Sequence, residues 1–286
     1  MVPAGVIVDL EEDASPELVV LDVDHPGFHE ADYRRRRNEI AQAALDHHGD
    51  GPVPRVAYTG EEHEVWREVW RNLEPLHFRY ACSEYLEASD RIRLSRDSIP
   101  QLADVNATIG PIHGFRMRPV AGLVSAKAFL RQLGHRVFLS TQYMRHHSVP
   151  LYTPEPDVVH ELIGHAATFA HPQFARLNQA FGEAALRASD AQIEQIGRLY
   201  WYTLEFGVVR ERGSLKVYGA GLLSSYGEIQ VFRDAAIRPL DFDSMGTMDY
   251  DITRYQPVLF AAASFSEMVD RLGRFFDDFG VGRSAS

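Results

Sequence analysis

The stretch PEPDVVHELIGH, residues 154–165, constrains this chain of 286 residues more than any other. Its two prolines lack the N–H group that a helix interior needs but a first turn does not. Asp157 falls in that first turn, where a negative charge suits the helix dipole. The helix that follows carries His160, Glu161 and His165, and imidazole and carboxylate groups bind iron, zinc, copper and nickel. The stretch therefore predicts a helix that presents metal ligands.

The spacing of the two histidines distinguishes two kinds of metal site. Zinc peptidases carry H-E-x-x-H, with histidines four residues apart on one helix face. His160 and His165 are five residues apart, which separates them by about 140° around an ideal α-helix. They can still converge on an ion lying against the helix, or a π-bulge near Gly164 can realign them. Either arrangement argues against a zinc metallopeptidase, in which Glu161 would act as general base on bound water.

Glu205 is the best candidate for a third ligand. It lies in LYWYTLEFG, residues 199–207, beside Leu204 and Phe206 and four residues after Trp201, which shares its helix face. A carboxylate among such neighbours costs free energy unless it is paired or bound to a metal. Two histidines and one carboxylate are the ligand pattern of non-haem Fe(II) oxygenases.

These motifs carry a resemblance to a known family. PEPDVVHELIGH, with YWYTLEFG downstream, resembles the pterin-dependent aromatic amino acid hydroxylases, and most closely the catalytic domain of phenylalanine hydroxylase. Further stretches follow that family in the same order, over roughly residues 20–275: DHPGF (24–28), PRVAY (54–58), IPQLADV (99–105), GFRMRPVAGL (114–123), STQYMRH (140–146) and YGAGLLSS (218–225). We therefore expect one mainly α-helical (α+β) catalytic domain with a few short strands at residues 21–280, after an arm at residues 1–20.

The resemblance implies a cofactor site. His160, His165 and Glu205 would hold Fe(II), and Glu161 would be a catalytic residue that faces a tetrahydrobiopterin or related tetrahydropterin, with O₂ as co-substrate. The pterin would also meet the backbone of Gly122 and Leu123 and the ring of Phe129. Leu139 departs from the family, because the animal phenylalanine enzyme has a histidine there, close to the pterin.

The resemblance also implies a pocket for a free amino acid. Arg145 matches the arginine that holds the substrate carboxylate, which a guanidinium can do bidentately. The other matching positions are Thr153, Gly221 and Ser224 for the amino acid backbone, and Pro156 and Trp201 for the ring walls.

We predict L-phenylalanine as the substrate, hydroxylated to tyrosine. Trp201 stands where tryptophan hydroxylases carry a smaller Phe, and Ile252 stands where tyrosine hydroxylases carry an acid. An apolar Ile252 leaves a phenol hydroxyl without a partner, whereas Asp251 would supply one after a shift of one residue. The alternatives are a phenylalanine 3-hydroxylase and a tyrosine or tryptophan hydroxylase. From other classes, the alternatives are a zinc metallopeptidase and a catalytically silent metal-binding or interaction protein.

Composition excludes several other classes. The net charge is −11 and the pI about 5.6, so we expect no nucleic acid and no anionic membrane as partner. A single cysteine, Cys82, excludes internal disulfides and thiolate metal clusters, and fits a reducing cytoplasm. We expect neither the regulatory domain nor the tetramerisation tail of the animal enzymes, and hence a monomer or weak dimer.

Local patterns predict the elements. We expect helices at residues 28–48, 61–87, 97–106, 126–135, 174–188 and 191–210, with a final helix ending at 276. We expect extended segments at 116–122 and 137–143 and a loop-rich stretch at 233–251. Arg34–Arg37 reads as a solvated or salt-bridged helix face. His146 and His147 are assigned structural roles, since adjacent side chains do not easily face one site.

Overall fold

A computed structural model describes residues 19–47 and 51–279. Its α-helices are α1 Ala31–Leu45, α2 Gly60–Tyr80, α3 Ser83–Ile92, α4 Leu102–His113, α5 Ala126–Gly134, α6 Pro172–Arg187, α7 Asp190–Tyr200, α8 Ala220–Ser224, α9 Glu228–Val231, α10 Phe242–Thr247 and α11 Phe265–Asp278. The π-helical turns are η1 His160–Ala166 and η3 Trp201–Glu205, and the 3₁₀ turns are η2 Thr168–Ala170 and η4 Phe232–Asp234. The strands are β1 Arg116–Pro119, β2 Val137–Ser140, β3 Val208–Glu211, β4 Ser214–Val217, β5 Ala236–Pro239 and β6 Val258–Ala262.

The strands form two small sheets. β1 and β2 pair in parallel, with α5 as the crossover between them, and the four-stranded sheet has the order β4-β3-β6-β5. Within it, β3 pairs antiparallel with β4 and parallel with β6. The expected mainly helical domain with a few short strands is confirmed.

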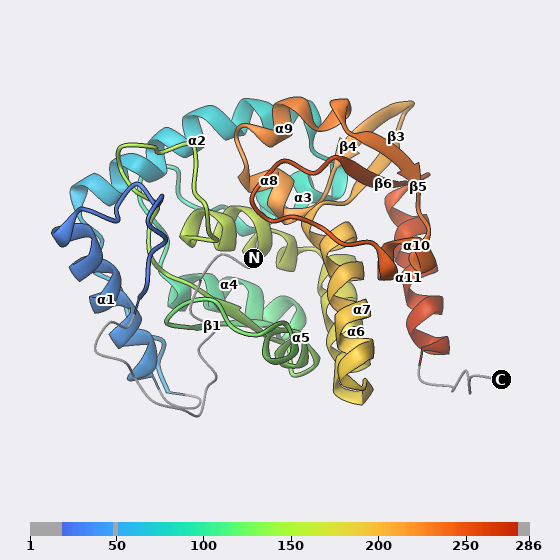
Figure 1. The fold of residues 1–286 in the computed structure, drawn as a ribbon, viewed down its shortest axis with the longest axis horizontal. Coiled ribbons are helices and arrows are strands. Elements are labelled where there is room, and N and C mark those ends of the chain that lie inside the picture. Colours follow the sequence, from blue (N-terminus) through green and yellow to red (C-terminus); the bar gives the residue numbers. More distant parts are fainter. Residues whose placement is uncertain (1–18, 48–50, 280–286) are drawn as a thin grey trace.

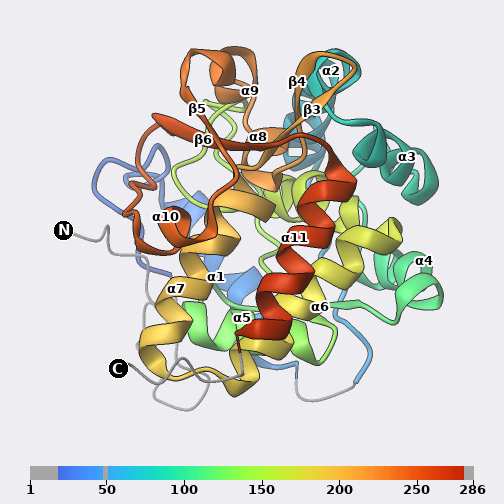
Figure 2. The same ribbon diagram turned by 90° about the vertical axis from the view of Figure 1, so that its right-hand side faces the viewer.

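The helices surround the segment that carries the histidines. In Figure 1, α1 lies at one end of the molecule and the four-stranded sheet at the other, with α2 along the upper edge. α6 packs against both α7 and α11, and the three run side by side in Figure 2. η1, in yellow-green at the centre of Figure 1, packs against α8.

The apolar side chains that recur at helical spacing on α2 are buried: Val65, Trp66, Val69, Trp70 and Leu73 are each at most 5% exposed. A capping box starts this helix, because Thr59 and Glu62 each bond the other's backbone N–H. The prediction of one helix to residue 87 is wrong. Cys82 donates its N–H to Val217 of β4 instead of continuing the helix, and α3 begins anew at Ser83.

Several other boundaries differ from those predicted, among them that of the helix expected at 97–106, which is α4 at Leu102–His113. The helix expected at 191–210 ends at Glu205, because a Cβ at Gly207 would lie 2.1 Å from the Tyr218 ring and the chain turns there into β3. The strand expected at 137–143 stops at Ser140, since Thr141 donates its N–H to the Glu161 side chain. The stretch at 233–251 contains β5 and α10, and β5 pairs in parallel with β6.

The arginine stretch of α1 is salt-bridged, as predicted. Arg35 pairs with Asp32, Arg36 with Glu62 and Arg37 with Glu155, at 2.8, 3.0 and 2.8 Å. Arg37 is not on a solvated face, however, because it is buried.

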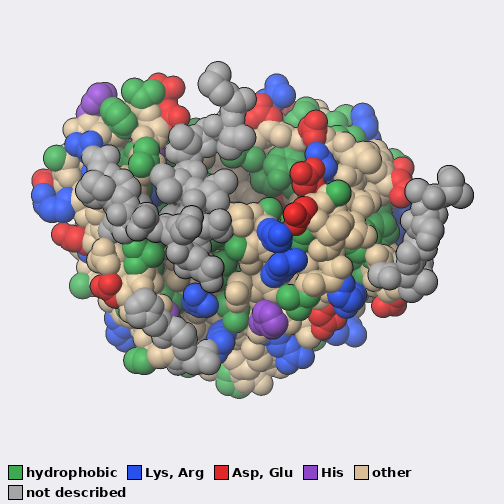
Figure 3. All heavy atoms as spheres, turned by 60° about the horizontal axis from the view of Figure 1, so that its bottom comes forward, with side chains coloured by type: hydrophobic (Ala, Val, Ile, Leu, Met, Phe, Trp, Pro, Cys, Tyr) green, Lys and Arg blue, Asp and Glu red, His purple; other side chains and the backbone are tan. Residues whose placement is uncertain are grey.

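Acidic and basic side chains are interspersed on the face in Figure 3, which also has a recess floored by hydrophobic side chains.

No helix within the described residues is long and apolar enough to cross a membrane. The expected arm at residues 1–20 lies almost wholly outside the described residues. The domain bounds, the cytoplasmic location and the monomeric or weakly dimeric state stay predictions.

Candidate functional site

The two segments that carry the predicted metal ligands both form π-helical turns. Ala167 donates its N–H to Leu162 and Phe206 donates its N–H to Trp201, each five residues back. A turn closed over five residues brings side chains five apart onto one face. The π-helical alternative for the His160–His165 spacing is therefore confirmed, and it extends over the whole of η1 rather than one bulge.

His160, His165 and Glu205 converge. Nε2 of His165 lies 3.0 Å from Oε1 of Glu205, and Nε2 of His160 lies 3.6 Å from Oε2 of the same carboxylate. The two Nε2 atoms are 3.0 Å apart. One ligand atom of each residue lies within 4.8 Å of the others, so the three side chains can share one metal ion.

Close packing of α8 on η1 orients His160. A Cβ at Gly164 would lie 2.8 Å from the carbonyl oxygen of Ala220, so only glycine allows this approach without a shift. Ser224 then reaches Nδ1 of His160 at 2.9 Å, while its own hydroxyl donates to Ala220. The serine oxygen therefore accepts the Nδ1 proton, which leaves the Nε2 lone pair facing Glu205 and His165. Two imidazole nitrogens and a carboxylate that meet in this way are a donor set that fits a divalent cation.

The protonation states agree with this fit. Burial lowers the pKa of His160 to about 4, so that the ring stays neutral, as a ligand must be. Burial opposes charge on Glu205, but His165 and His160 hold the pKa of that carboxyl below its ordinary value. Despite burial, Glu205 raises the pKa of His165. A cation would replace the proton that these two groups share.

Glu161 points to the end of β2. Its Oε1 accepts from the backbone N–H and the hydroxyl of Thr141, at 3.1 and 3.0 Å. Burial raises the pKa of Glu161 to about 7, although His165 and the Thr141 donors oppose the rise. Glu161 is thus a buried carboxyl that can hold or give up a proton near neutral pH.

Of the residues predicted to meet the pterin, Phe129 is connected to His165 of η1 through Phe138. Phe129 contacts the rings of Phe138 and Tyr200 edge-on, and the Phe138 ring lies 4.6 Å from that of His165. Leu139 is buried in an apolar cluster against which Phe129 also packs. Gly122 and Leu123 follow β1, and a Cβ at Gly122 would meet no heavy atom within 4 Å. The backbone at Gly122 therefore borders open space.

Arg145 lies next to Asp157, just before the start of η1. Its Nε and Nη2 donate to both carboxylate oxygens of Asp157, at 2.9 and 2.8 Å, and its backbone N–H donates to Asp157 as well. Asp157 also accepts the N–H of His160, at 3.3 Å. Burial opposes this charge, but Arg145 keeps the pKa of Asp157 low. Nη1 of Arg145 takes no part in the pair.

Trp201 is held on three sides. Its ring stacks on Tyr250 at 4.1 Å and lies 4.5 Å from Phe206, and its Nε1 donates to Oε1 of Gln256 at 3.0 Å. A Cβ at Gly221 would lie 2.6 Å from the Phe206 ring, so this glycine allows the aromatic to approach.

Thr153 and Pro156 lie in the loop before η1. The Thr153 hydroxyl donates to the backbone of Glu155 at 2.7 Å, and the Pro156 carbonyl accepts from the hydroxyls of Thr141 and Tyr143. Both groups therefore already have partners within the chain.

Sequence reasoning missed two partners of the predicted residues. It placed Asp157 only as a first-turn charge, and it did not find Gln256. Their partners lie 12 and 55 residues away, at separations that no helical or strand period marks.

The fold and this site define a family. The model of the biopterin-dependent aromatic amino acid hydroxylases matches residues 12–281, and the chain belongs to that family. This match rules against the alternative of a zinc metallopeptidase.

The relatives that the chain resembles are named for different substrates and ring positions. A tyrosine 3-monooxygenase of Canis lupus familiaris is 47% identical over 89% of this chain and 53% of its own length. A phenylalanine 3-hydroxylase of Streptomyces coeruleorubidus is 45% identical over 88% of this chain and 91% of its own length. The phenylalanine hydroxylase of Chromobacterium violaceum, solved with iron(III) and 7,8-dihydrobiopterin, superposes with a TM-score of 0.73 at 26% identity, over 82% of this chain and 89% of that one. The chain spans about half the length of the tyrosine 3-monooxygenases that it matches.

Proposed function

We propose that this protein is an iron- and tetrahydropterin-dependent monooxygenase that hydroxylates the ring of a free aromatic amino acid. The observation that carries the proposal is the convergence of His160, His165 and Glu205 from two π-helical turns. Membership of the hydroxylase family and the similarity to a phenylalanine hydroxylase that binds iron and a dihydropterin support it.

The protein's own residues would position the reactants. Fe(II) held by His160, His165 and Glu205 would supply oxygen activation, together with a reduced pterin and O₂. Glu161 lies on the same helix and would hold a proton beside the pterin, whose ring would lie between Phe129 and the backbone at Gly122 and Leu123.

The amino acid would bind on the side of Arg145. Asp157 fixes the guanidinium plane through two hydrogen bonds, so Nη1 would donate to the substrate carboxylate with little loss of side-chain freedom. Thr153, Gly221 and Ser224 would border the backbone of the amino acid. Trp201 and Pro156 would enclose the ring and exclude water from it.

We propose L-phenylalanine as the substrate and tyrosine as the product. Asp251, the acid next to Ile252, is engaged locally, because it accepts from the N–H and hydroxyl of Thr253 and pairs with Arg254 at 3.1 Å. A phenol hydroxyl in the pocket would therefore compete with existing bonds. Hydroxylation at ring position 3 is the second candidate, favoured by the phenylalanine 3-hydroxylase that is similar over 91% of its length.

Product analysis tests these proposals. Purified protein with Fe(II), O₂ and tetrahydrobiopterin is given phenylalanine, tyrosine and tryptophan in competition, and products are identified by chromatography with mass spectrometry. We expect the highest kcat/KM for phenylalanine and tyrosine as its product. A preference for tyrosine or tryptophan would contradict the substrate, and 3-hydroxyphenylalanine would contradict the ring position alone. Glu205→Ala is the matched control, because it should show neither bound iron nor product.

A further inference from the structure

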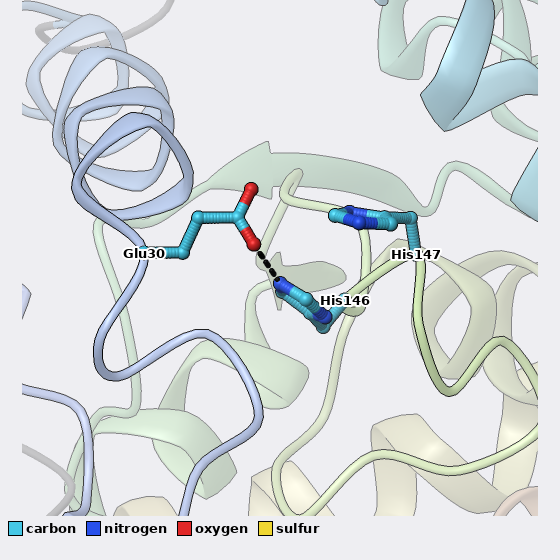
Figure 4. A group of neighbouring side chains, drawn as sticks. All are labelled: Glu30, His146 and His147. Atoms are coloured by element: carbon cyan, nitrogen blue, oxygen red, sulfur yellow. Dashed lines mark hydrogen bonds and ion pairs between the residues drawn. The ribbon is translucent and has the colours of Figure 1, made fainter.

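A second group of metal-ligand side chains lies outside the candidate active site. Glu30, at the start of α1, meets His146 and His147 from the segment that follows Arg145 (Figure 4). One ligand atom of each lies within 4.8 Å of the others. Nε2 of His146 lies 2.8 Å from Oε2 of Glu30.

The expectation that adjacent histidines point apart is wrong here. The ring centroids of His146 and His147 are 4.3 Å apart and the planes differ by 33°. Side chains alternate in an extended strand, but this segment turns: Val149 donates its N–H to the carbonyl of His146. The turn places both rings on the side of Glu30, as Figure 4 shows.

The surroundings fix the orientation of His146. Its Nδ1 lies 2.8 Å from the hydroxyl of Ser148, and Tyr33 packs edge-on against its ring at 4.9 Å. The backbone N–H of Ser148 also donates to Nδ1, at 3.3 Å, and these contacts turn Nε2 toward Glu30, with which it is hydrogen-bonded. A partner at one ring nitrogen orients the other in the same way at metal sites. His147 is partly exposed, and its Nδ1 lies 3.5 Å from Oε2 of Glu61.

We propose that Glu30, His146 and His147 form a second metal site, which binds a divalent transition-metal ion, with Zn²⁺ as the best match. Two imidazole nitrogens and one carboxylate oxygen are a typical zinc set, completed by water in the fourth position. Ca²⁺ and Mg²⁺ prefer oxygen ligands alone. The exposed side at His147 gives the ion a path from solvent, and Glu61 adds a carboxylate at that edge.

Such an ion would link two segments far apart in sequence. Glu30 precedes α1, while His146 directly follows Arg145, whose guanidinium is held by Asp157 at the start of η1. Binding would therefore stabilise the attachment of α1 to the segment that carries the predicted substrate arginine. This role goes beyond the proposed function and does not depend on it.

The test counts bound zinc in the full chain. Protein stripped with a chelator is dialysed against Zn²⁺ and analysed by mass spectrometry for metal content. We expect about two ions per chain for the wild type, one of them at His160, His165 and Glu205, and about one for His147→Ala and Glu30→Gln. His135→Ala removes an exposed histidine elsewhere and should keep both ions.

A second measurement keeps the proposal testable if a variant folds poorly. Crystals of the wild type soaked in Zn²⁺ should give an anomalous peak within bonding distance of Nε2 of His146. The proposal is overturned if that peak is missing, or if folded His147→Ala binds as much zinc as the wild type.

Discussion

Replacement of Glu228 by glutamine should stabilise the protein, and only above mildly acidic pH. Glu228 lies in α9, is 6% exposed, and accepts the N–H of Gln256 at 2.7 Å. Burial raises the pKa of this carboxyl from 4.5 to about 7, although the Gln256 donor opposes the rise. The folded protein therefore binds this proton more tightly than the unfolded chain does.

The sign and size follow from linkage between protonation and folding. Below about pH 4.5 the carboxyl is protonated in both states and contributes no pH dependence. Between about pH 4.5 and 7 the folded state binds more protons, so the free energy of unfolding falls as pH rises. Above pH 7 the loss of unfolding free energy levels off at about 3 kcal/mol, because the pKa differs by about 2.5 units between the two states and each unit corresponds to about 1.36 kcal/mol.

Urea denaturation of both proteins at pH 5, 6, 7 and 8 measures this effect. Glu228→Gln keeps an oxygen for the Gln256 N–H and is neutral at every pH. Its advantage over the wild type should grow from about 1 kcal/mol at pH 5 to about 3 kcal/mol at pH 8. Glu183→Gln, an exposed position on α6, should show no such trend. A pH-independent difference, or a less stable variant at pH 8, would refute the reasoning.

Three further substitutions test the site. Glu205→Ala should bind no iron at the triad and make no product, measured by metal analysis and chromatography; full turnover without iron would exclude this ligand set. Arg145→Ala should lower the free energy of unfolding by about 3–5 kcal/mol, because it leaves Asp157 buried without its partner; denaturation at an unchanged urea midpoint would contradict that. Gln256→Leu should remove the hydrogen bond that holds the Trp201 ring and lower kcat/KM for phenylalanine by about tenfold, the effect of one lost hydrogen bond. Unchanged kinetics would show that this hydrogen bond does not position the Trp201 ring.

Local pattern was enough to predict the part of the site that one helix carries. His160, Glu161 and His165 stand together in sequence, and their five-residue spacing already included a π-helical solution. Glu205 was found because a carboxylate among aromatic residues needs a partner. In each case the physical reason lies within a few residues of the side chain itself.

Pairings across long stretches of chain could not be predicted in this way. The Gln256–Trp201 bond joins residues 55 apart, and β5 pairs with β6 across α10. Each of these segments has several acceptable partners by composition, and only the packed chain selects one. The turn at His146 illustrates the same limit at short range, because no local pattern marks it and yet it brings two adjacent side chains to one side.

The function of the site also depends on the number of residues in the two π-helical turns. Each turn holds one residue more than an α-helical ladder would over the same hydrogen bonds. Loss of a single residue between His160 and His165 would let the backbone relax into ordinary helix without an unpaired N–H, and the two histidines would then stand four residues apart, at the spacing of a zinc peptidase helix. Surface loops absorb insertions and deletions at small cost, but in η1 and η3 such a change would leave a sound helix whose ligands no longer have the spacing of this triad. Natural and engineered variants of this chain should therefore differ in length at their loops and keep the residue count of these two turns.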